Sequence, residues 1–328
     1  MKIYFPYLES YEKAGGSEQG WAISIANLFS LSGHQVYFGR GNDGWDTFLP
    51  EQFDEEHKAD VMVLPERLDL WSDKTRWNIH RRCARKFLFG VFHPFTNPEF
   101  LIDVPSDSAL ITPYRSSGSE CVVIPYAYYS SKPLPRFSNR TLGWTLRNPF
   151  DSGGIAHPPF ATHLNHLKSC YELVKKGHKL ILFNDHTYPR EDLSDYPLIQ
   201  EACSIITALR NHSRVEVSSH LPYNDYMDLL SKTSVVVPLN GLGSTTEALK
   251  IGVVPLSWGS EGNVYSDFPY QESYHRLSYQ SIYNKMEKLL TDEEFYKNEY
   301  YRLLEKSAVY SLDYGLQSIN KVLEKLYG

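Results

Sequence analysis

The sequence predicts an α/β protein built from two Rossmann-like units. Short apolar runs of strand length alternate with longer segments of helical periodicity, the order typical of parallel sheets covered by helices. The chain has 328 residues, 42% hydrophobic and 22% charged, which is enough to bury a core in each of two domains. A stretch at 131–139 that holds Pro133 and Pro135 has the composition of a linker between them.

The first half of the chain has β-α-β order. A helix is expected from about Ser17, because Trp21, Ile25 and Leu28 recur at core spacing, and it should stop at Gly33. The expected strands are residues 2–5, 35–38, 60–64, 86–92, 109–111 and 121–124.

The second half repeats this alternation. Its expected strands are residues 141–144, 179–183, 215–217, 234–237 and 253–256, and its expected helices are 161–176, 197–210, 224–231 and 244–251. The segment from about residue 281 onwards is helical, and Thr291-Asp-Glu-Glu294 has the form of a capping box. We therefore divide the chain into domains at 1–135 and 136–305, with a C-terminal helix at 306–328 that could pack back on the first domain.

Composition limits the classes of function. Lys and Arg number 33 against 39 Asp and Glu, a net charge of −6, which argues against a protein whose main partner is the nucleic-acid backbone. The four cysteines show no metal-ligand or disulfide spacing, and His163-x-x-His166 has no further ligand nearby in sequence, so we expect no metal. Pro6 and Glu9 interrupt the apolar residues at the start of the chain, so we expect no hydrophobic signal segment. No apolar run reaches the roughly 18 residues that a membrane-spanning helix needs. We expect a cytoplasmic protein without a transmembrane segment.

The strongest local signal is a buried strand at 235–237, a loop at 238–243 and a helix opening at Ser244. Gly241 and Gly243 let the backbone approach a ligand closely, and the amides of Ser244, Thr245 and Thr246 could face it. No P-loop lysine follows, so a diphosphate held without dedicated metal ligands fits better than nucleotide triphosphate hydrolysis. Ser244-x-x-Glu247 is also a capping box, so the motif alone leaves a ligand role and a structural role open.

This segment resembles the donor-binding region of GT-B glycosyltransferases, especially glycosyltransferase family 4. That family's E-A-(hydrophobic)-x-x-G-x-P pattern is similar to Glu247-Ala-Leu-Lys-Ile-Gly-Val-Val-Pro255. Gly15-Gly16-Ser-Glu, Gly33-His34-Gln-Val36 and Val122-Val-Ile-Pro125 resemble further family motifs, in the family's order. The resemblance implies a GT-B fold, in which two Rossmann-like domains face each other across a cleft.

The resemblance also implies residue roles. Glu247 would accept hydrogen bonds from the two ribose hydroxyls of a donor nucleotide, and Arg147 would neutralise the leaving diphosphate. His93 matches a family histidine near the transferred sugar, and His220 lies where family members contact the base. The other expected donor-binding residues are Gly15, Gly16, Asn240, Gly241, Leu242, Gly243, Ser244, Thr245 and Thr246.

Two departures from the family pattern concern the donor. The glutamate expected eight positions before Glu247 is absent, since Leu239 stands there with Asn240 beside it. The family's lysine shortly after the arginine is also missing after Arg147. Leaving-group stabilisation would then depend more heavily on Arg147 and the helix N-terminus.

The resemblance therefore implies a metal-independent hexosyltransferase that uses a UDP- or GDP-type sugar donor, needs no cofactor and retains anomeric configuration. The acceptor would be a carbohydrate or another hydroxyl-bearing molecule. Two alternatives stay open: a DNA-base glycosyltransferase of viral type, and a non-catalytic nucleotide-sugar-binding protein.

Overall fold

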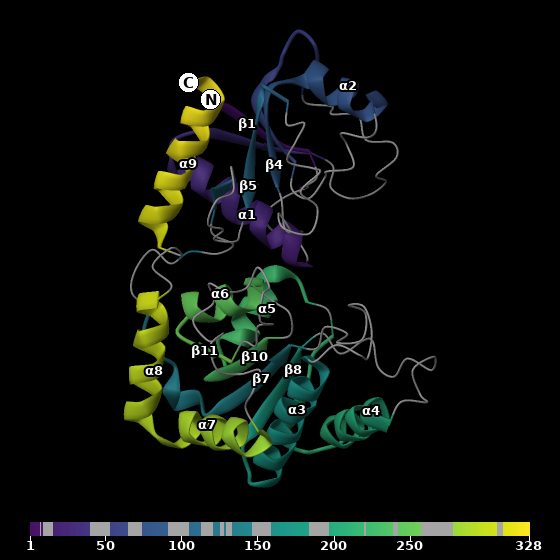
Figure 1. Ribbon diagram of the computed structural model, residues 1–328, viewed down its shortest axis with the longest axis vertical. Helices are drawn as coiled ribbons and strands as arrows, with labels where there is room; N and C mark the ends of the chain where they lie inside the picture. Colours follow the sequence, from purple (N-terminus) through teal and green to yellow (C-terminus); the bar gives the residue numbers. More distant parts are fainter. Residues whose placement is uncertain are drawn as a thin grey trace. The chain divides into compact units, whose positions relative to one another are not determined.

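The structure of the protein is a computed structural model (Figure 1). It describes residues 1–6, 8, 16–39, 53–64, 74–90, 105–112, 121–124, 128, 133–145, 159–183, 197–219, 221–238, 242–256, 278–306 and 311–328. The chain forms two compact units. Unit 1 consists of Met1–Ser130 and Val309–Gly328, and unit 2 of Ser131–Ala308.

Unit 1 is built on a six-stranded sheet with the order β2-β1-β3-β4-β5-β6. The pairings along this sheet are parallel. Its strands are β1 (Lys2–Phe5), β2 (Gln35–Phe38), β3 (Ala59–Leu64), β4 (Ala84–Gly90), β5 (Ser108–Thr112) and β6 (Val122–Val123). Its helices are α1 (Gly16–Leu31), α2 (Lys74–Cys83) and α9 (Leu312–Tyr327).

Helix α1 ends as the sequence predicts. Gly33 has a φ of +82°, and its amide donates to Ser30 O while the next amide, of His34, donates to Phe29 O. This pair of bonds is a Schellman motif, which requires the left-handed conformation that glycine adopts without cost. Earlier in α1, the buried Trp21 Nε1 donates to Ile124 O at 3.0 Å and so fixes the helix to the residue that follows β6.

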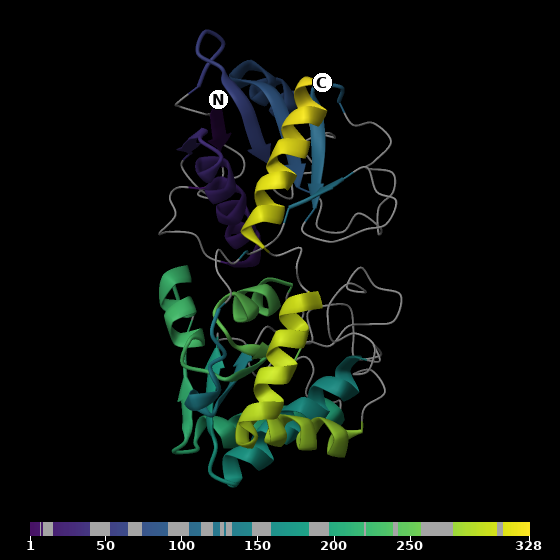
Figure 2. The ribbon, with the colours of Figure 1, turned by 90° about the vertical axis from the view of Figure 1, so that its left-hand side faces the viewer.

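The C-terminal helix α9 belongs to unit 1, although it follows unit 2 in sequence. It lies beside α1 and β5 (Figure 2). Gly315 permits close packing on α1, because a Cβ there would meet Leu28 Cδ2 at 2.7 Å. At its other end, Tyr327 Oη donates to Asp60 O at 3.1 Å.

Unit 2 contains a five-stranded sheet with the order β11-β10-β7-β8-β9, and its pairings are parallel. The strands are β7 (Thr141–Thr145), β8 (Lys179–Phe183), β9 (Val215–Val217), β10 (Val235–Pro238) and β11 (Val254–Pro255). The helices are α3 (Pro159–Lys175), α4 (Pro197–Arg210), α5 (Tyr223–Leu230), α6 (Leu242–Lys250), α7 (Tyr279–Thr291) and α8 (Glu293–Lys306). Leu230, Val236 and Ala248 belong to a core cluster that includes residues of α5, α6 and the sheet.

Residues 133–139 pack on unit 2, although their prolines predict a linker. The segment contains a short 3₁₀ helix, η3 (Phe137–Asn139), and the ring of the buried Phe137 lies 5.6 Å from that of Tyr296. Arg136 N donates to Gly252 O at 2.9 Å, and Asn139 Nδ2 donates to Ser231 O at 2.9 Å. Packing of one aromatic side chain and these bonds outweighs the local preference of Pro133 and Pro135 for a free, extended chain.

Two further features differ from the sequence prediction. Helix α2 (Lys74–Cys83) is not among the predicted elements, because its sequence KTRWNIHRRC has few apolar residues to show a helical period. The expected capping box at Thr291 is shifted by one residue. Asp292 Oδ1 accepts the Phe295 amide at 2.9 Å and so caps α8, whereas Thr291 ends α7 and its hydroxyl donates to Glu287 O.

Tyr296 links α8 to the residues that precede β10 and β11. Its buried hydroxyl is 2.7 Å from Ser234 O and 3.0 Å from Gly252 O. We expect Tyr296→Phe to lower the free energy of unfolding of unit 2 by about 1 kcal/mol, since both carbonyls keep a backbone donor and only the hydroxyl's bonds are lost. Urea denaturation followed by far-UV circular dichroism measures this change, and Tyr301→Phe, at an exposed ring on the same helix, is the control. Equal midpoints for the two variants would contradict the expectation.

Among the described residues, no helix has the length and apolarity needed to cross a bilayer.

Candidate functional site

The candidate site begins where the strand order of unit 2 reverses. From β7 the chain adds β8 and β9 on one side, and then β10 and β11 on the other. Strands β7 and β10 are therefore neighbours, and Thr145 at the end of β7 is the register partner of Pro238 at the end of β10. In open parallel sheets, ligands bind beyond the carboxyl ends of the strands at this kind of switch point.

Helix α6 follows β10 and begins at Leu242, two residues before the expected start at Ser244. Ser244 thus lies inside the first turn, so Ser244 and Glu247 do not form a capping box across the helix start. The amides without an intrahelical acceptor are those of the first residues, Leu242, Gly243 and Ser244. The amides of Thr245 and Thr246, which the sequence predicts to face a ligand, fall within the helical hydrogen-bond ladder. The positive end of the helix dipole still favours an anion there.

Glu247 is the charged residue of this helix that the structure buries most completely. Its exposed fraction is 5%, and Thr245 and Thr246 before it are each 1% exposed. Burial raises the pKa of Glu247 to about 7, because removing a carboxylate from water disfavours its charged form. A buried carboxyl that titrates near neutrality is typical of functional sites.

Three side chains act on the Glu247 carboxyl. The positive charge of Lys250 and hydrogen bonds from the Tyr223 and Tyr226 side chains all lower its pKa, but less than burial raises it. Burial also lowers the pKa of Lys250, although Glu247 counteracts that shift. Helix α5 thus places Tyr223 and Tyr226, three residues apart on one helical face, close enough to the carboxyl of α6 to affect its pKa.

Tyr226 is itself held by an aromatic contact. Its ring lies 5.6 Å from that of the buried Phe183, at the end of β8, with an interplanar angle of 73°. Edge-to-face contacts of this kind fix ring orientation. The Tyr226 ring is therefore fixed against the end of the sheet on the side of α5 that faces Glu247.

The C-terminal end of α6 is held in place by backbone and side-chain hydrogen bonds. The Gly252 amide donates to Leu249 O and the Val253 amide to Ala248 O, which is a Schellman motif. Gly252 has a φ of +91°, and a Cβ at this position would overlap the Leu134 carbonyl oxygen. The glycine of the resembled motif is thus explained by backbone geometry. Tyr300 Oη donates to Leu249 O at 2.7 Å and anchors the last turn.

The sequence-predicted residues are distributed unevenly over the described parts of the chain. Leu242, Gly243, Ser244, Thr245, Thr246 and Glu247 lie together on α6, and Gly16 is the first residue of α1 in unit 1. Six predicted residues lie outside the described residues: Gly15, His93, Arg147, His220, Asn240 and Gly241. Arg147 follows two residues after the end of β7, and Asn240 and Gly241 stand between β10 and α6 in sequence.

Sequence reasoning missed Tyr223, Tyr226 and Lys250. The spacing of the two tyrosines places them on one face of α5, but nothing local indicates that this face meets a carboxyl more than 20 positions later. In the ranges that the structure describes, no three His, Cys, Asp or Glu side chains gather at metal-ligand positions.

The fold is similar to that of several solved structures. One is an alpha-glucosyltransferase in complex with UDP-glucose and DNA containing an abasic site, with a TM-score of 0.57, 11% identity and 98% of each chain covered. Sucrose-phosphate synthase from Thermosynechococcus elongatus has a TM-score of 0.60 at 10% identity, over 100% of this chain and 99% of that one. MnaA of S. aureus, solved with UDP, has a TM-score of 0.56 at 13% identity, over 99% of this chain and 97% of that one.

These likenesses confirm the predicted fold class: an α/β protein with parallel sheets that matches GT-B structures. No protein-family model matches the chain, and neither does any curated protein sequence. At 10–13% identity the comparisons concern the fold, so the chemistry has to be argued from the residues.

Proposed function

We propose that this chain is a glycosyltransferase that moves a hexose from a nucleotide-diphosphate sugar, of the UDP or GDP type, to an acceptor hydroxyl. The observation that carries the proposal is the buried Glu247, which lies in the second turn of the helix that follows the switch-point strand and has a pKa of about 7. Structures of similar fold contain UDP or UDP-glucose, and a carboxylate is suited to a ribose diol because it accepts from both hydroxyls.

The remaining roles follow from chain position and from the resemblance. The free amides of Leu242, Gly243 and Ser244 bind the diphosphate at the positive end of α6. Arg147 neutralises the leaving group, since a guanidinium stays charged at any working pH. It follows β7, whose last residue is paired with the last residue of β10. His93 approaches the transferred sugar, and the backbone at His220 contacts the base.

Two groups bear on sugar choice. Gly15 and Gly16 allow the first turn of α1 to approach the phosphates or the sugar. Asn240, next to the position where family members carry a glutamate, offers an amide in place of a carboxylate, which changes the preference for sugar hydroxyls.

The four cysteines are free thiols in the structure, and we propose the cytoplasm as the place of action.

The proposed reaction retains anomeric configuration and uses no metal. The bond between the anomeric carbon and the diphosphate oxygen lengthens first, as Arg147 and the α6 amides stabilise the developing negative charge. The acceptor oxygen then attacks from the same face and passes its proton to the departing phosphate. Such a step depends on electrostatic stabilisation of the leaving group rather than on a strong base.

A donor panel tests this proposal. Hydrolysis of UDP-, GDP- and ADP-sugars is measured in the wild type, in Arg147→Ala and in the control Arg302→Ala, whose guanidinium pairs with Glu299 on α8. We expect one donor class to turn over, and Arg147→Ala to lower kcat by about a hundredfold while the control stays active. Donor binding without turnover by the wild type, with sugar acceptors added, would favour a non-catalytic nucleotide-sugar-binding protein instead.

A second candidate is glycosylation of a modified base in DNA. Its support is the alpha-glucosyltransferase solved with DNA, which matches over 98% of both chains, whereas the net charge of −6 weighs against it. A gel-shift titration with duplex DNA carrying a hydroxymethylated base, at low and high salt, tests it. This candidate fails if the DNA is not retarded at low salt.

A further inference from the structure

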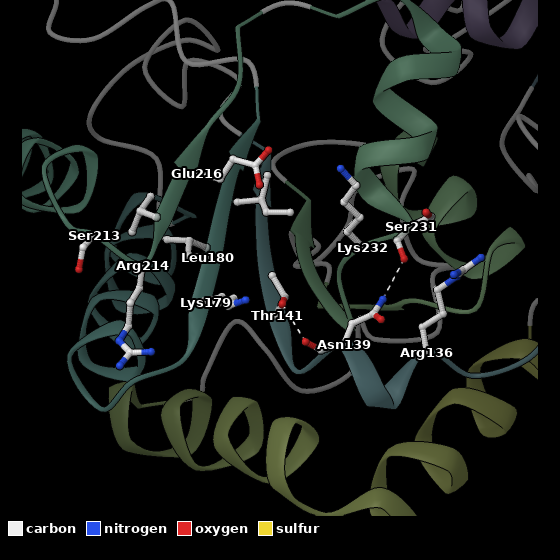
Figure 3. Close-up of a pocket in the computed structure, with 12 residues that line it drawn as sticks. Arg136, Asn139, Thr141, Lys179, Leu180, Ser213, Arg214, Glu216, Ser231 and Lys232 are labelled. Carbon is white, nitrogen blue, oxygen red and sulfur yellow. Dashed lines mark hydrogen bonds between the residues drawn. The ribbon is translucent and has the colours of Figure 1, made fainter.

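Unit 2 contains a pocket at the end of the sheet opposite to the candidate site. Its volume is about 830 Å³, within the usual range for pockets that hold small molecules. It is lined at the first residues of three strands, Thr141 of β7, Lys179 of β8 and Val215 of β9, and by the segment after α5 (Figure 3). The candidate site lies instead at the carboxyl ends of β7 and β10, so the two sites are separate.

The lining of this pocket is strongly cationic. Four of its side chains carry positive charge, Arg136, Lys179, Arg214 and Lys232, against one carboxylate, Glu216. This excess stands out in a chain whose net charge is −6. Such a concentration of cations attracts anions and raises their local concentration.

The cations of the pocket are not neutralised in the way that others in unit 2 are. Lys168 pairs with Glu201 at 2.7 Å, and Lys297 pairs with Glu293 at 2.6 Å. Over the described ranges, neither Lys179 nor Lys232 has an acidic side chain within ion-pair distance, and Glu216 forms no ion pair either. These three side chains are exposed and are therefore accessible to a ligand from solvent.

The two arginines are positioned by backbone contacts. Arg136 Nε donates to Ile251 O at 2.6 Å, and one terminal nitrogen of Arg214 donates to Gly177 O at 3.0 Å. The two guanidinium groups thus lie at opposite margins of the pocket, bonded to carbonyl groups outside its lining (Figure 3). They add to the positive field that attracts an anion to the pocket.

The floor of the pocket adds apolar surface and a firm frame. The half-buried Val215 contributes an apolar side chain, which suits the face of a sugar ring, and the buried Ile181 ties the floor to the core of unit 2. Asn139 Nδ2 donates to Ser231 O at 2.9 Å and to Thr233 O at 3.2 Å, and so holds the segment that carries Lys232. The Glu216 carboxylate can accept a hydrogen bond from a ligand hydroxyl.

We propose that this pocket binds a small phosphorylated ligand, a phosphate ester that also carries hydroxyl groups, such as a sugar phosphate. Lysine ammonium groups bind phosphate as point charges and guanidinium groups bind it in a bidentate manner. Lys179 and Lys232 contact the phosphate, and Glu216 the hydroxyls. This site is independent of the proposed transferase function.

Isothermal titration of the full chain with glucose 6-phosphate tests the proposal. The pocket variant is Lys179→Ala with Lys232→Ala. The matched control is Lys168→Ala with Lys297→Ala, which removes the same charge at two lysines outside the pocket. We expect the pocket variant to bind about tenfold or more weakly than the wild type, and the control to bind like the wild type. Glu247→Ala should leave this binding unchanged, so failure here and failure of the transferase proposal are distinguishable.

Three outcomes would overturn the proposal: no binding of glucose 6-phosphate by the wild type, equal weakening in both double variants, or loss of binding in Glu247→Ala alone. If the alanine variant does not fold by circular dichroism, Lys179→Gln with Lys232→Gln takes its place, since it keeps most of the length of the side chains. A short single-stranded DNA is titrated in parallel. DNA binding that needs the two lysines, without glucose 6-phosphate binding, would assign the pocket to a polymer instead.

Discussion

Glu247→Gln should strongly weaken binding of the sugar donor while making the unliganded protein more stable at alkaline pH. The glutamine amide has the size of the carboxyl, but it has one neutral acceptor oxygen in place of two anionic ones. It therefore cannot accept hydrogen bonds from both ribose hydroxyls as the carboxylate does. We expect the Kd for the donor nucleotide to rise by about a hundredfold, because a charge-assisted hydrogen bond is lost and the amide N–H₂ faces donor hydroxyls. Isothermal titration with UDP and GDP measures the loss.

The gain in stability follows from the pKa of Glu247. Folding raises that pKa from its ordinary value of 4.5 to about 7. Between these values the folded chain keeps a proton that the unfolded chain has lost, so the stability of the wild type falls as the pH rises from 4.5 to about 7. At about 1.4 kcal/mol per unit, the cost above this window is on the order of 3 kcal/mol. Glutamine does not ionise in this range, so Glu247→Gln is not destabilised in this way.

Thermal unfolding at about pH 5 and about pH 8 measures this effect. Relative to the wild type, Glu247→Gln should gain stability between the two pH values, whereas Glu294→Gln, at an exposed position of α8, should not. The result that contradicts this reasoning is a constant difference between Glu247→Gln and the wild type at both pH values. A loss of donor binding without the stability gain would mean that Glu247 binds the donor but that folding does not raise its pKa.

Donor affinity should itself depend on pH through the same group. The ribose hydroxyls need the ionised carboxyl as acceptor, so the affinity should rise between about pH 6 and about pH 8 and level off above the pKa. Tyr223→Phe removes the hydroxyl of the tyrosine that lowers the pKa of Glu247 more, and should shift this rise to higher pH. Tyr301→Phe, at a ring outside the site, should not shift it. A flat affinity profile in the wild type would exclude Glu247 as the titrating acceptor.

Much of the fold could be predicted from sequence because the signals are local. The helix ends at Gly33 and Gly177 are confirmed by φ values of +82° and +108°, since both positions need a left-handed residue that glycine supplies. Strands such as β8 (Lys179–Phe183) are confirmed with the predicted bounds, because a continuous apolar run is enough to mark a strand buried on both faces.

The sequence predictions fail where contacts between residues that are distant in sequence determine the structure. The prolines near 133 predict a linker, but burial of Phe137 against Tyr296 holds this segment on unit 2. The tyrosines around Glu247 come from another helix, α5, and no periodicity shows that pairing. The family resemblance identifies the carboxyl, whereas only the tertiary structure indicates that it is buried and has a pKa close to neutrality.

Gly252→Ala should destabilise unit 2 more than Tyr296→Phe or any other single substitution at this end of α6. At a φ of +91° a residue with a Cβ is strained, and this Cβ would also overlap the Leu134 carbonyl oxygen. The neighbouring backbone cannot move easily, since Gly252 O accepts from Arg136 N and from the Tyr296 hydroxyl. We expect the free energy of unfolding of unit 2 to fall by about 4 kcal/mol or more, the range of steric clashes inside a packed structure.

Gly177→Ala provides a matched control for the strain alone. Gly177 also ends a helix in unit 2 with a positive φ of +108°, but a Cβ there would have as its nearest neighbour Arg214 Cζ at 3.9 Å. This variant should lose only about 1–2 kcal/mol, the cost of the left-handed conformation. Urea denaturation followed by circular dichroism compares the two. Because α6 ends at this turn and carries Glu247, Gly252→Ala should also weaken donor binding, whereas Gly177→Ala should not. Equal losses of stability in the two variants would show that the turn at Gly252 can relax, and that Leu134 does not fix the end of α6.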